Sequence, residues 1–267
     1  MSSETILDTI MANRRKQVDA LKARIPLRIL SERAFAAREK RVPVDFAAAL
    51  KKPGLSVIAE VKKASPSKGV IQPDFRPVEI ARAYAHAGAD AISVLTEETY
   101  FQGSGEILKQ VRDAVELPVL RKDFIFDEWQ LCEACVLGAD AVLLIASVLN
   151  VFELKKLMAV AEMLGMQCLV EVRSERQALD ALRVGARVVG VNNRNLATFD
   201  VDLSVSAKFR HLFPSDVVFV SESGITTSAD MERAADLGAD AVLIGETLMR
   251  ASNIEEKLRE LRAFVHD

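Results

Sequence analysis

The sequence predicts a (β/α)8 barrel, the TIM-barrel class of α/β fold, with a helical extension before the first strand. From Ser56 onward, eight short apolar segments typical of buried strands alternate with eight segments typical of helices. An open doubly wound sheet is less favoured, because no GxGxxG loop follows any strand. A similar stretch also recurs four times at intervals of about 50 residues, each copy a helix end, a glycine and a strand: AGADAISVLT from Ala87, LGADAVLLIA from Leu137, VGARVVGVNN from Val184 and LGADAVLIGE from Leu237.

The residues before the first strand are predicted to be helical. We expect residues 1–54 to form an extension and residues 55–267 to form the barrel, together as one domain. An amphipathic helix is predicted over residues 5–23, and a second helix over residues 27–38 after a proline that breaks the first. A short apolar helix is predicted over residues 45–50. The simplest expectation is that these helices plug one end of the barrel.

Turn and capping residues support the boundaries of the barrel elements. Pro77 can begin a helix, where its missing N–H is not needed, and Asp127 can cap another. Ser252 and Glu255 suggest a capping box for the last helix. Strands are predicted at residues 56–61, 90–95, 118–122, 140–145, 167–171, 187–192, 217–221 and 240–244. Helices are predicted at residues 77–87, 104–115, 127–137, 151–164, 174–184, 203–211, 228–237 and 253–265.

Composition excludes several classes of protein. Half of the residues are hydrophobic, 27% are charged and the net charge is −3, which is the balance of a globular protein. The basic residues are scattered, so no surface suited to nucleic acid or an acidic membrane is expected. No stretch of about 20 apolar residues could span a bilayer, and the polar N-terminus has no signal-peptide pattern. We therefore expect a soluble cytoplasmic protein.

Cysteine and histidine usage gives no sign of redox or metal chemistry. Cys132 and Cys135 form a C-x-x-C pair, but they lie in a helical pattern without a second pair, so packing is the favoured role. The histidines lie on predicted helices or near the end of the chain, at His86, His211 and His266. Neither a metal site nor a serine–histidine pair is therefore predicted.

The ends of the predicted strands carry the residues with catalytic potential. In a (β/α)8 barrel the side chains at the carboxyl ends of the strands surround the active site. Alternation sends Glu60 and Lys62 to one face of the first strand, and it places Lys122 on the inward face of the third. Six strands end in charged or amide groups, on the same face as apolar residues earlier in the strand. Contact with solvent alone does not explain this pattern. Lysine and glutamate gathered at a desolvated barrel mouth suit acid–base catalysis.

Glycines after the last two strands suggest a phosphate site. Gly224 and Gly245 present backbone N–H groups at the position where this fold commonly binds phosphate. Tight turns would also favour glycine at these positions, so both interpretations stay open.

Six motifs occur once each, in order, at the predicted strand ends. They are E-V-K-x-x-S-P-S-K-G, S-V-L-T-E-E-x-x-F-Q-G-S, R-K-D-F-I, L-V-E-V, G-V-N-N-R-N-L and S-E-S-G-I. Each motif alone is weak, but the ordered set resembles the indole-3-glycerol-phosphate synthase family of tryptophan biosynthesis, and the N-terminal helix fits it too. The resemblance implies a carboxy-lyase. It would close a ring in 1-(2-carboxyphenylamino)-1-deoxy-D-ribulose 5-phosphate and release carbon dioxide and water, giving indole-3-glycerol phosphate.

The resemblance also implies catalytic roles. Lys122 would be the general acid that protonates the ribulose carbonyl, and Glu171 would serve the later proton transfers and dehydration. Asn192 would orient these groups. Lys62 would contact the phosphate, share the acid role or both, which the sequence leaves open, and Glu60 would position the lysines and substrate hydroxyls. No metal or other cofactor is implied.

The same resemblance implies a set of substrate-binding residues. The phosphate would lie on the backbone of Gly224 and Gly245, and the anthranilate carboxylate would meet Arg194. A mobile lid would run from Ser65 to Gly69, and three apolar side chains would line the aryl pocket. We expect a monomer that could associate with other tryptophan-pathway enzymes. The predicted binding residues are Ser65, Ser67, Phe101, Phe124, Leu143, Arg194, Glu222, Ser223, Gly224, Gly245 and Glu246, the last through its backbone N–H.

Two other functions compete with this interpretation. A related phosphosugar barrel, such as phosphoribosylanthranilate isomerase, should carry a cysteine or aspartate acid–base pair at its strand ends, and none is evident. A non-catalytic barrel that binds phosphorylated metabolites would need the phosphate glycines only. The complete set of lysines and glutamates argues against this second alternative.

Overall fold

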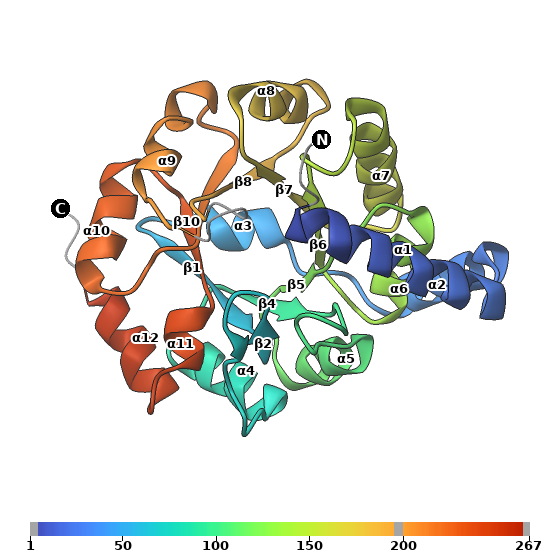
Figure 1. Cartoon of the computed structure of the whole chain (residues 1–267), viewed down its shortest axis with the longest axis horizontal. Helices are drawn as coiled ribbons and strands as arrows, with labels where there is room; N and C mark the ends of the chain where they lie inside the picture. The colour runs from blue at the N-terminus through green and yellow to red at the C-terminus, as the bar shows by residue number, and fades with distance from the viewer. Residues whose placement is uncertain (1–4, 195–199, 264–267) are drawn as a thin grey trace.

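The computed structural model describes residues 5–194 and 200–263, and its core is a closed barrel. All eight barrel strands run parallel, in the order β1-β10-β9-β8-β7-β6-β5-β4, so β1 pairs with both β10 and β4. Figure 1 shows the ring of strands inside a ring of helices. The prediction of a (β/α)8 barrel is confirmed. The strands are β1 (Ser56–Val61), β4 (Ala91–Leu95), β5 (Val119–Lys122), β6 (Ala141–Ile145), β7 (Gln167–Val172), β8 (Val188–Asn192), β9 (Val218–Glu222) and β10 (Ala241–Ile244).

Helices connect successive strands and cover the outside of the barrel. The longer ones are α4 (Pro77–His86), α5 (Gly105–Ala114), α6 (Glu128–Val136), α7 (Val151–Met163), α8 (Glu175–Arg183), α10 (Ser228–Asp236) and α12 (Ile254–Arg262). Shorter pieces lie in the last connections: α9 (Ser204–Ala207), the 3-10 helix Arg210–Leu212 and α11 (Glu246–Met249).

The internal repeat has a structural explanation. Its glycines end helices in the left-handed region, with φ of 89° at Gly88 and 87° at Gly138, which other residues adopt only with strain. Its aspartates, Asp90, Asp140 and Asp240, accept hydrogen bonds from backbone N–H groups near the start of β1, β5 and β9, at 2.8 to 2.9 Å. Each copy therefore ends a helix and fixes the amino end of a neighbouring strand.

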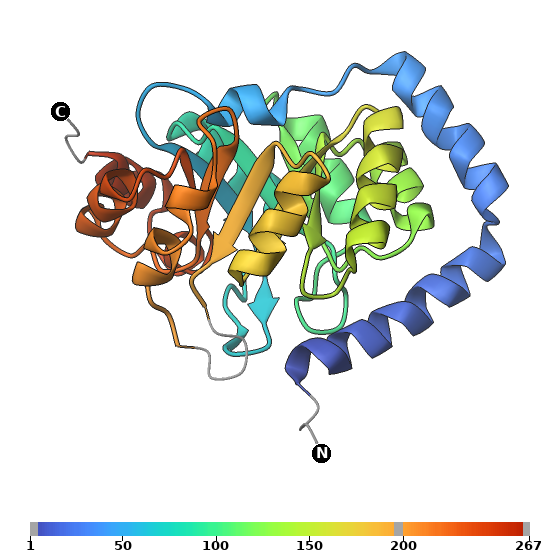
Figure 2. The ribbon, with the colours of Figure 1, turned by 90° about the horizontal axis from the view of Figure 1, so that it is seen from above.

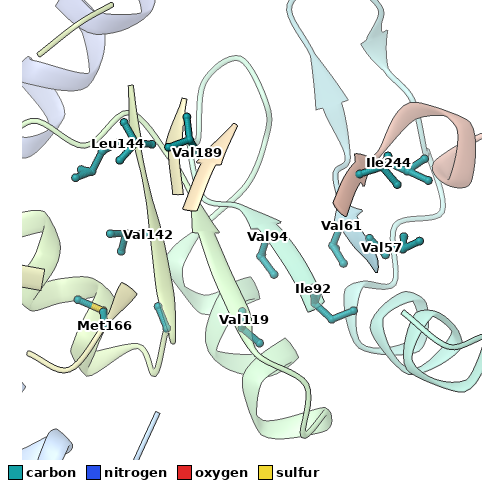
Figure 3. Packing of buried hydrophobic residues seen from close by; sticks show 14 of the residues in the cluster. Val57, Val61, Ile92, Val94, Val119, Val142, Leu144, Met166, Val189 and Ile244 are labelled. Atoms are coloured by element: carbon teal, nitrogen blue, oxygen red, sulfur yellow. The ribbon is translucent and has the colours of Figure 1, made fainter. Parts of the chain in front are cut away.

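Alternation along each strand divides the core into two layers. On β1, Val57 and Val61 point outward and pack under the helices, whereas Ile58 points into the barrel. Figure 3 shows part of the outer layer, including Val57, Ile92 and Val142 from three strands. The inward-facing side chains near the amino ends of the strands are apolar. The polar groups at the carboxyl ends therefore lie above an apolar layer that excludes water.

The N-terminal extension wraps around the barrel, as Figure 2 shows. It consists of α1 (Ile6–Arg24), α2 (Leu27–Lys40) and α3 (Phe46–Leu50). Only α3 plugs the barrel, because Phe46 and Leu50 are completely buried in the interior cluster at the amino ends of the strands. The expectation that all three helices do so was wrong: α2 packs against α6 on the outside, and α1 reaches the opposite end.

Polar contacts hold α1 near the carboxyl ends of the strands. Arg14 binds the Asp123 carboxylate through two N–H groups, at 3.0 and 2.6 Å, and both side chains are buried. Gln17 donates to Thr99 Oγ1 at 3.0 Å. The first helix is thus attached to the loops after β4 and β5, which border the barrel mouth.

Three local details differ from the prediction. The polar turn after β1 forms a small antiparallel hairpin of β2 (Ala64–Ser65) and β3 (Gly69–Val70). The predicted helix 203–211 is broken into α9 and the 3-10 helix, where serine side chains bond to groups outside the helix. The cap of α12 is Asn253 and not Ser252, because the Asn253 side chain accepts the third backbone N–H of the helix.

Candidate active site

A cavity of about 850 Å³ opens at the carboxyl ends of the strands. Every residue singled out from the sequence lies on its wall, although the residues come from all parts of the barrel. These are Glu60, Lys62, Ser65, Ser67, Phe101, Lys122, Phe124, Leu143, Glu171, Asn192, Arg194, Glu222, Ser223, Gly224, Gly245 and Glu246.

Two lysines and two glutamates form the floor of the cavity. Lys62 Nζ lies 2.6 Å from Glu60 Oε2, as their alternation on one strand face predicted. Lys122 Nζ lies 3.2 Å from Glu222 Oε2 and 4.0 Å from Glu60 Oε1. The Glu222 side chain is 1% exposed and that of Lys122 is 14% exposed. Lys122 therefore stands between two buried carboxylates with its ammonium group at the cavity.

Burial and mutual charge shift the pKa values of this group. Burial raises the pKa of Glu60, but Lys62 and Lys122 outweigh burial and leave it below its ordinary value. Burial raises the pKa of Glu222 to about 7, because the attraction of Lys122 is opposed by the nearby Glu171 and Glu60 carboxylates. Burial alone would lower the pKa of Lys122, yet the carboxylates around it raise that pKa. At neutral pH, Lys122 is thus protonated, and the neighbouring Glu222 carboxyl group has a pKa close to the pH of the solution.

Glu171 lies across the cavity and is held from two sides. Asn192 Nδ2 donates to its Oε2 at 3.3 Å, and Arg173 Nη2 donates to its Oε1 at 2.8 Å. Burial raises the pKa of Glu171, but Arg173 and Lys122 outweigh this and lower it. Asn192 Oδ1 in turn accepts the Ser223 hydroxyl at 3.1 Å. The carboxylate is therefore an oriented anion.

Two glycines make room for the buried carboxylates. A Cβ on Gly190 would lie 2.1 Å from Glu222 Oε1. A Cβ on Gly245 would lie 2.2 Å from Glu60 Oε2 and 2.9 Å from Lys62 Nζ. Any larger residue at either position would displace a charged group of the floor.

The loops after β9 and β10 form a polar side of the cavity. Ser223 and Gly224 have φ of 69° and 100°, so the chain turns sharply at the end of β9. Glu246 lies between two arginines, 3.3 Å from Arg194 Nη2 and 3.1 Å from Arg250 Nε. This side combines turned backbone with cationic side chains, which suits an anionic ligand group.

The opposite side of the cavity is apolar. The rings of Phe101 and Phe124 lie with centroids 6.1 Å apart, and Leu143 completes the predicted trio. The first turns of α1 add three further apolar side chains that the sequence did not suggest: Ile6, Leu7 and Ile10.

The β2–β3 hairpin borders the cavity. Ser65 and Ser67 both line it, and Ala64 N donates to Phe101 O at 3.2 Å, so the hairpin is attached to the loop after β4. The Ser65 hydroxyl oxygen is buried and makes no hydrogen bond to the described residues. It is a buried polar group on a cavity-lining residue, without a hydrogen-bond partner in that part of the chain.

Within residues 5–194 and 200–263, no cluster of three or more histidine, cysteine, aspartate or glutamate side chains could hold a metal ion. Cys132 and Cys135 are both buried on α6, as expected of packing residues, and burial raises the pKa of the Cys132 thiol to about 11. In the same described part of the chain, no helix has the length and apolar character needed to span a bilayer.

Comparison with known proteins identifies the family. The family model for indole-3-glycerol phosphate synthase matches residues 7–261. The chain belongs to the indole-3-glycerol phosphate synthase family. It is 50% identical to the indole-3-glycerol phosphate synthase of Acetivibrio thermocellus over 97% of this chain and 99% of that protein. It is 46% identical to that of Halalkalibacterium halodurans, over 96% of each chain.

Two solved structures with the same fold have lower sequence identity to this chain. The 3-hexulose-6-phosphate synthase of Salmonella typhimurium superposes with a TM-score of 0.64 at 16% identity, over 78% of this chain and 96% of that one. The thiamine phosphate pyrophosphorylase of Pyrococcus furiosus gives 0.60 at 20% identity, over 80% and 95%. These likenesses show the barrel only.

Three arginines were missed from the sequence: Arg173 and Arg250 line the cavity, and Arg14 pairs with Asp123 on its wall. Arg173 follows Glu171 by two residues, the same spacing as Glu60 and Lys62, so strand alternation could have found it. Arg14 had no local signal, because its partner Asp123 is brought to it only by the fold.

Proposed function

We propose that this chain converts 1-(2-carboxyphenylamino)-1-deoxy-D-ribulose 5-phosphate to indole-3-glycerol phosphate, carbon dioxide and water, with Lys122 as the general acid. The observation that carries the proposal is the position of Lys122, between the buried Glu60 and Glu222 in a cavity that Glu171 also lines. The membership of the chain in the indole-3-glycerol phosphate synthase family supports the choice of reaction.

The first step joins the ring to the sugar. The aryl carbon that bears the carboxylate attacks the ribulose carbonyl carbon, and Lys122 protonates the carbonyl oxygen as its charge develops. The neighbouring carboxylates keep Lys122 protonated beforehand, since they raise its pKa. The attack leaves an iminium on the ring. The carboxylate then departs as carbon dioxide, and its bonding electrons neutralise the iminium.

The second step removes water. The new hydroxyl leaves with a proton, and the adjacent CH₂ group loses a proton to form the indole double bond. Glu171 is the proposed base, because it is an anion oriented by Asn192. Glu222 lies 3.2 Å from Lys122 and has a pKa of about 7, so it is suited to return a proton to the lysine.

Binding groups surround these residues. We assign the phosphate to the turned backbone at Gly224 and to the backbone at Gly245, directly before α11, and Lys62 either contacts it or shares the acid role. The aryl ring is assigned to the apolar side, and its carboxylate to Arg194. Ser65 lines the cavity and its hydroxyl oxygen has no hydrogen-bond partner in the described part of the chain, which supports a substrate contact from the hairpin.

The remaining polar wall residues receive supporting roles. Glu60 positions the two lysines, and Ser67, Ser223 and the backbone N–H of Glu246 contribute contacts around the phosphate. We also propose a monomer as the active form.

The experiment is a fluorescence assay for indole product with the purified chain, in the presence of EDTA. Lys122→Met should reduce kcat by about 10²–10⁴-fold with little change in KM, since a general acid acts mainly in the transition state. Lys155→Met, at an exposed position on α7, is the matched control and should behave as the parent.

An isomerase assay and a substrate-binding measurement, made beside the indole assay, distinguish the two alternatives. Isomerisation of a phosphoribosyl substrate without indole formation would favour the isomerase, and saturable binding without turnover would favour the metabolite-binding barrel. A change confined to KM in Lys122→Met would contradict the acid role.

A further inference from the structure

The pair formed by Glu171 and Arg173 is an unusual feature of the barrel mouth. Arg173 directs both Nε and Nη2 to the same carboxylate oxygen, Glu171 Oε1, at 3.2 and 2.8 Å. An ion pair on the surface usually contributes little, but the Glu171 side chain is only 3% exposed and that of Arg173 is 23% exposed. The pair therefore belongs to the cavity wall and not to the solvated exterior.

The backbone of Arg173 is anchored as well as its side chain. Its N–H donates to Gln177 Oε1 at 2.8 Å, which ties the end of β7 to the first turns of α8. The two N–H groups of the planar guanidinium converge on one carboxylate oxygen and hold it in place, whereas a lysine ammonium offers no such fixed pair of donors. Because Asn192 holds the other oxygen, the two contacts together define one orientation of the Glu171 carboxylate.

The other groups that face Glu171 do not replace this contact. Asn192, from β8, is neutral and holds the second oxygen at 3.3 Å. Lys122, from β5, adds positive charge, but it is also paired with Glu222 of β9 at 3.2 Å. The Glu222 and Glu171 carboxylates repel each other when both are ionised. Arg173 is the one cation within hydrogen-bond distance of Glu171 in the described part of the chain.

We propose that Arg173 is a positioning residue that fixes the direction of the Glu171 carboxylate and holds it as an anion through the catalytic cycle. The inference rests on the proposed function, in which Glu171 is the base of the dehydration. The inference adds that Arg173 determines how far the pH can fall before Glu171 is protonated and kcat declines. Loss of the arginine leaves a buried carboxylate that takes up a proton more readily, and burial then dominates.

The first test compares Arg173→Met, Arg173→Lys and the control Arg176→Met in pH profiles of kcat and KM. Arg176 follows three residues later and its side chain is 91% exposed. In Arg173→Met, the pH below which kcat declines should rise by about 1–3 units. At neutral pH, kcat should fall by about tenfold or more, with a smaller change in KM. Arg173→Lys should return that limiting pH in part to the parent value, and Arg176→Met should leave it unchanged.

The second test does not depend on activity. Glutamate labelled with ¹³C at the side-chain carboxyl gives a resonance for Glu171, assigned by its disappearance in Glu171→Gln. That resonance should titrate at higher pH in Arg173→Met than in the parent. An unchanged titration, or an acidic limb that stays in place while only thermal stability falls, would overturn the inference. Absence of turnover in the parent would contradict the proposed function, and the titration would still decide the role of Arg173.

Discussion

Replacement of Gly190 by alanine should disturb catalysis without adding or removing any polar group. The new methyl carbon would lie 2.1 Å from Glu222 Oε1, whereas ordinary contact begins at 3.4 Å. The carboxylate must therefore retreat by more than 1 Å. Its other oxygen lies 3.2 Å from Lys122 Nζ, and it has little space in which to move because the side chain is 1% exposed. Overpacking of this kind costs about 1–3 kcal/mol of stability.

The effect on turnover should exceed the effect on binding. A displacement of about 1 Å in a catalytic group can cost about 10²-fold in rate, so kcat of Gly190→Ala should fall by one to two orders of magnitude. KM should change less, since the aryl side lies on other strands and the phosphate is assigned to backbone groups and not to the displaced carboxylate. Steady-state kinetics and urea unfolding measure the two effects. Gly54→Ala, where a Cβ would meet nothing within 4 Å, is the control for kcat and should keep the parent value, although the φ of 82° at Gly54 means that alanine there costs some stability.

A double variant identifies the cause. In a Glu222→Ala background the methyl group has space, so the stability cost of Gly190→Ala should largely disappear. If the cost is the same in both backgrounds, or if Gly190→Ala turns over like the parent, the steric account of this glycine is refuted.

Two further perturbations follow from the charges around the site. The pKa of Glu222 rises from 4.5 to about 7 on folding, so this group stabilises the folded state below about pH 4.5 and loses that contribution as pH rises to 7. In the parent, the free energy of unfolding measured with urea should therefore contain a decline of about 3 kcal/mol between pH 4.5 and 8, and Glu222→Gln should remove that decline. If the pH dependence is the same in both proteins, the raised pKa of Glu222 is contradicted. Arg14→Met removes one of the two arginines that pair with the buried Asp123 carboxylate, which keeps Arg121, and should cost about 1–3 kcal/mol in the same measurement. Lys22→Met, which breaks a more exposed pair on the same helix, should cost at most about 1 kcal/mol, and equal costs would show that burial is not the deciding factor.

The barrel could be predicted because its signals are local. The repeat places a glycine where a helix must end with positive φ and, in three copies, an aspartate where strand N–H groups need an acceptor. Strand alternation placed Glu60 and Lys62 side by side, and the fold has them 2.6 Å apart. The course of α1 and α2 could not be predicted in the same way, because an amphipathic helix shows which face it buries but not what it packs against.

Contacts between distant segments escaped the sequence for a related reason. Nothing near Gly190 indicates that it faces Glu222, since the two meet only because β8 and β9 are neighbours in register. Arg14 lies more than 100 residues from Asp123. Arg173 differs, because the spacing that revealed Glu60 and Lys62 is present there too.

The arrangement of charges suggests why one cavity can serve both an acid step and a base step. Lysines hold the pKa of Glu60 down, and arginine does the same for Glu171, while burial and these two anions push that of Glu222 up to about 7. Groups whose pKa values are driven apart in this way are suited to opposite roles. In the proposed mechanism Lys122 gives its proton to the carbonyl, Glu171 accepts one later, and Glu222 carries protons between turnovers. Neutralising Glu222 should therefore slow the return of a proton to Lys122 more than it weakens substrate binding.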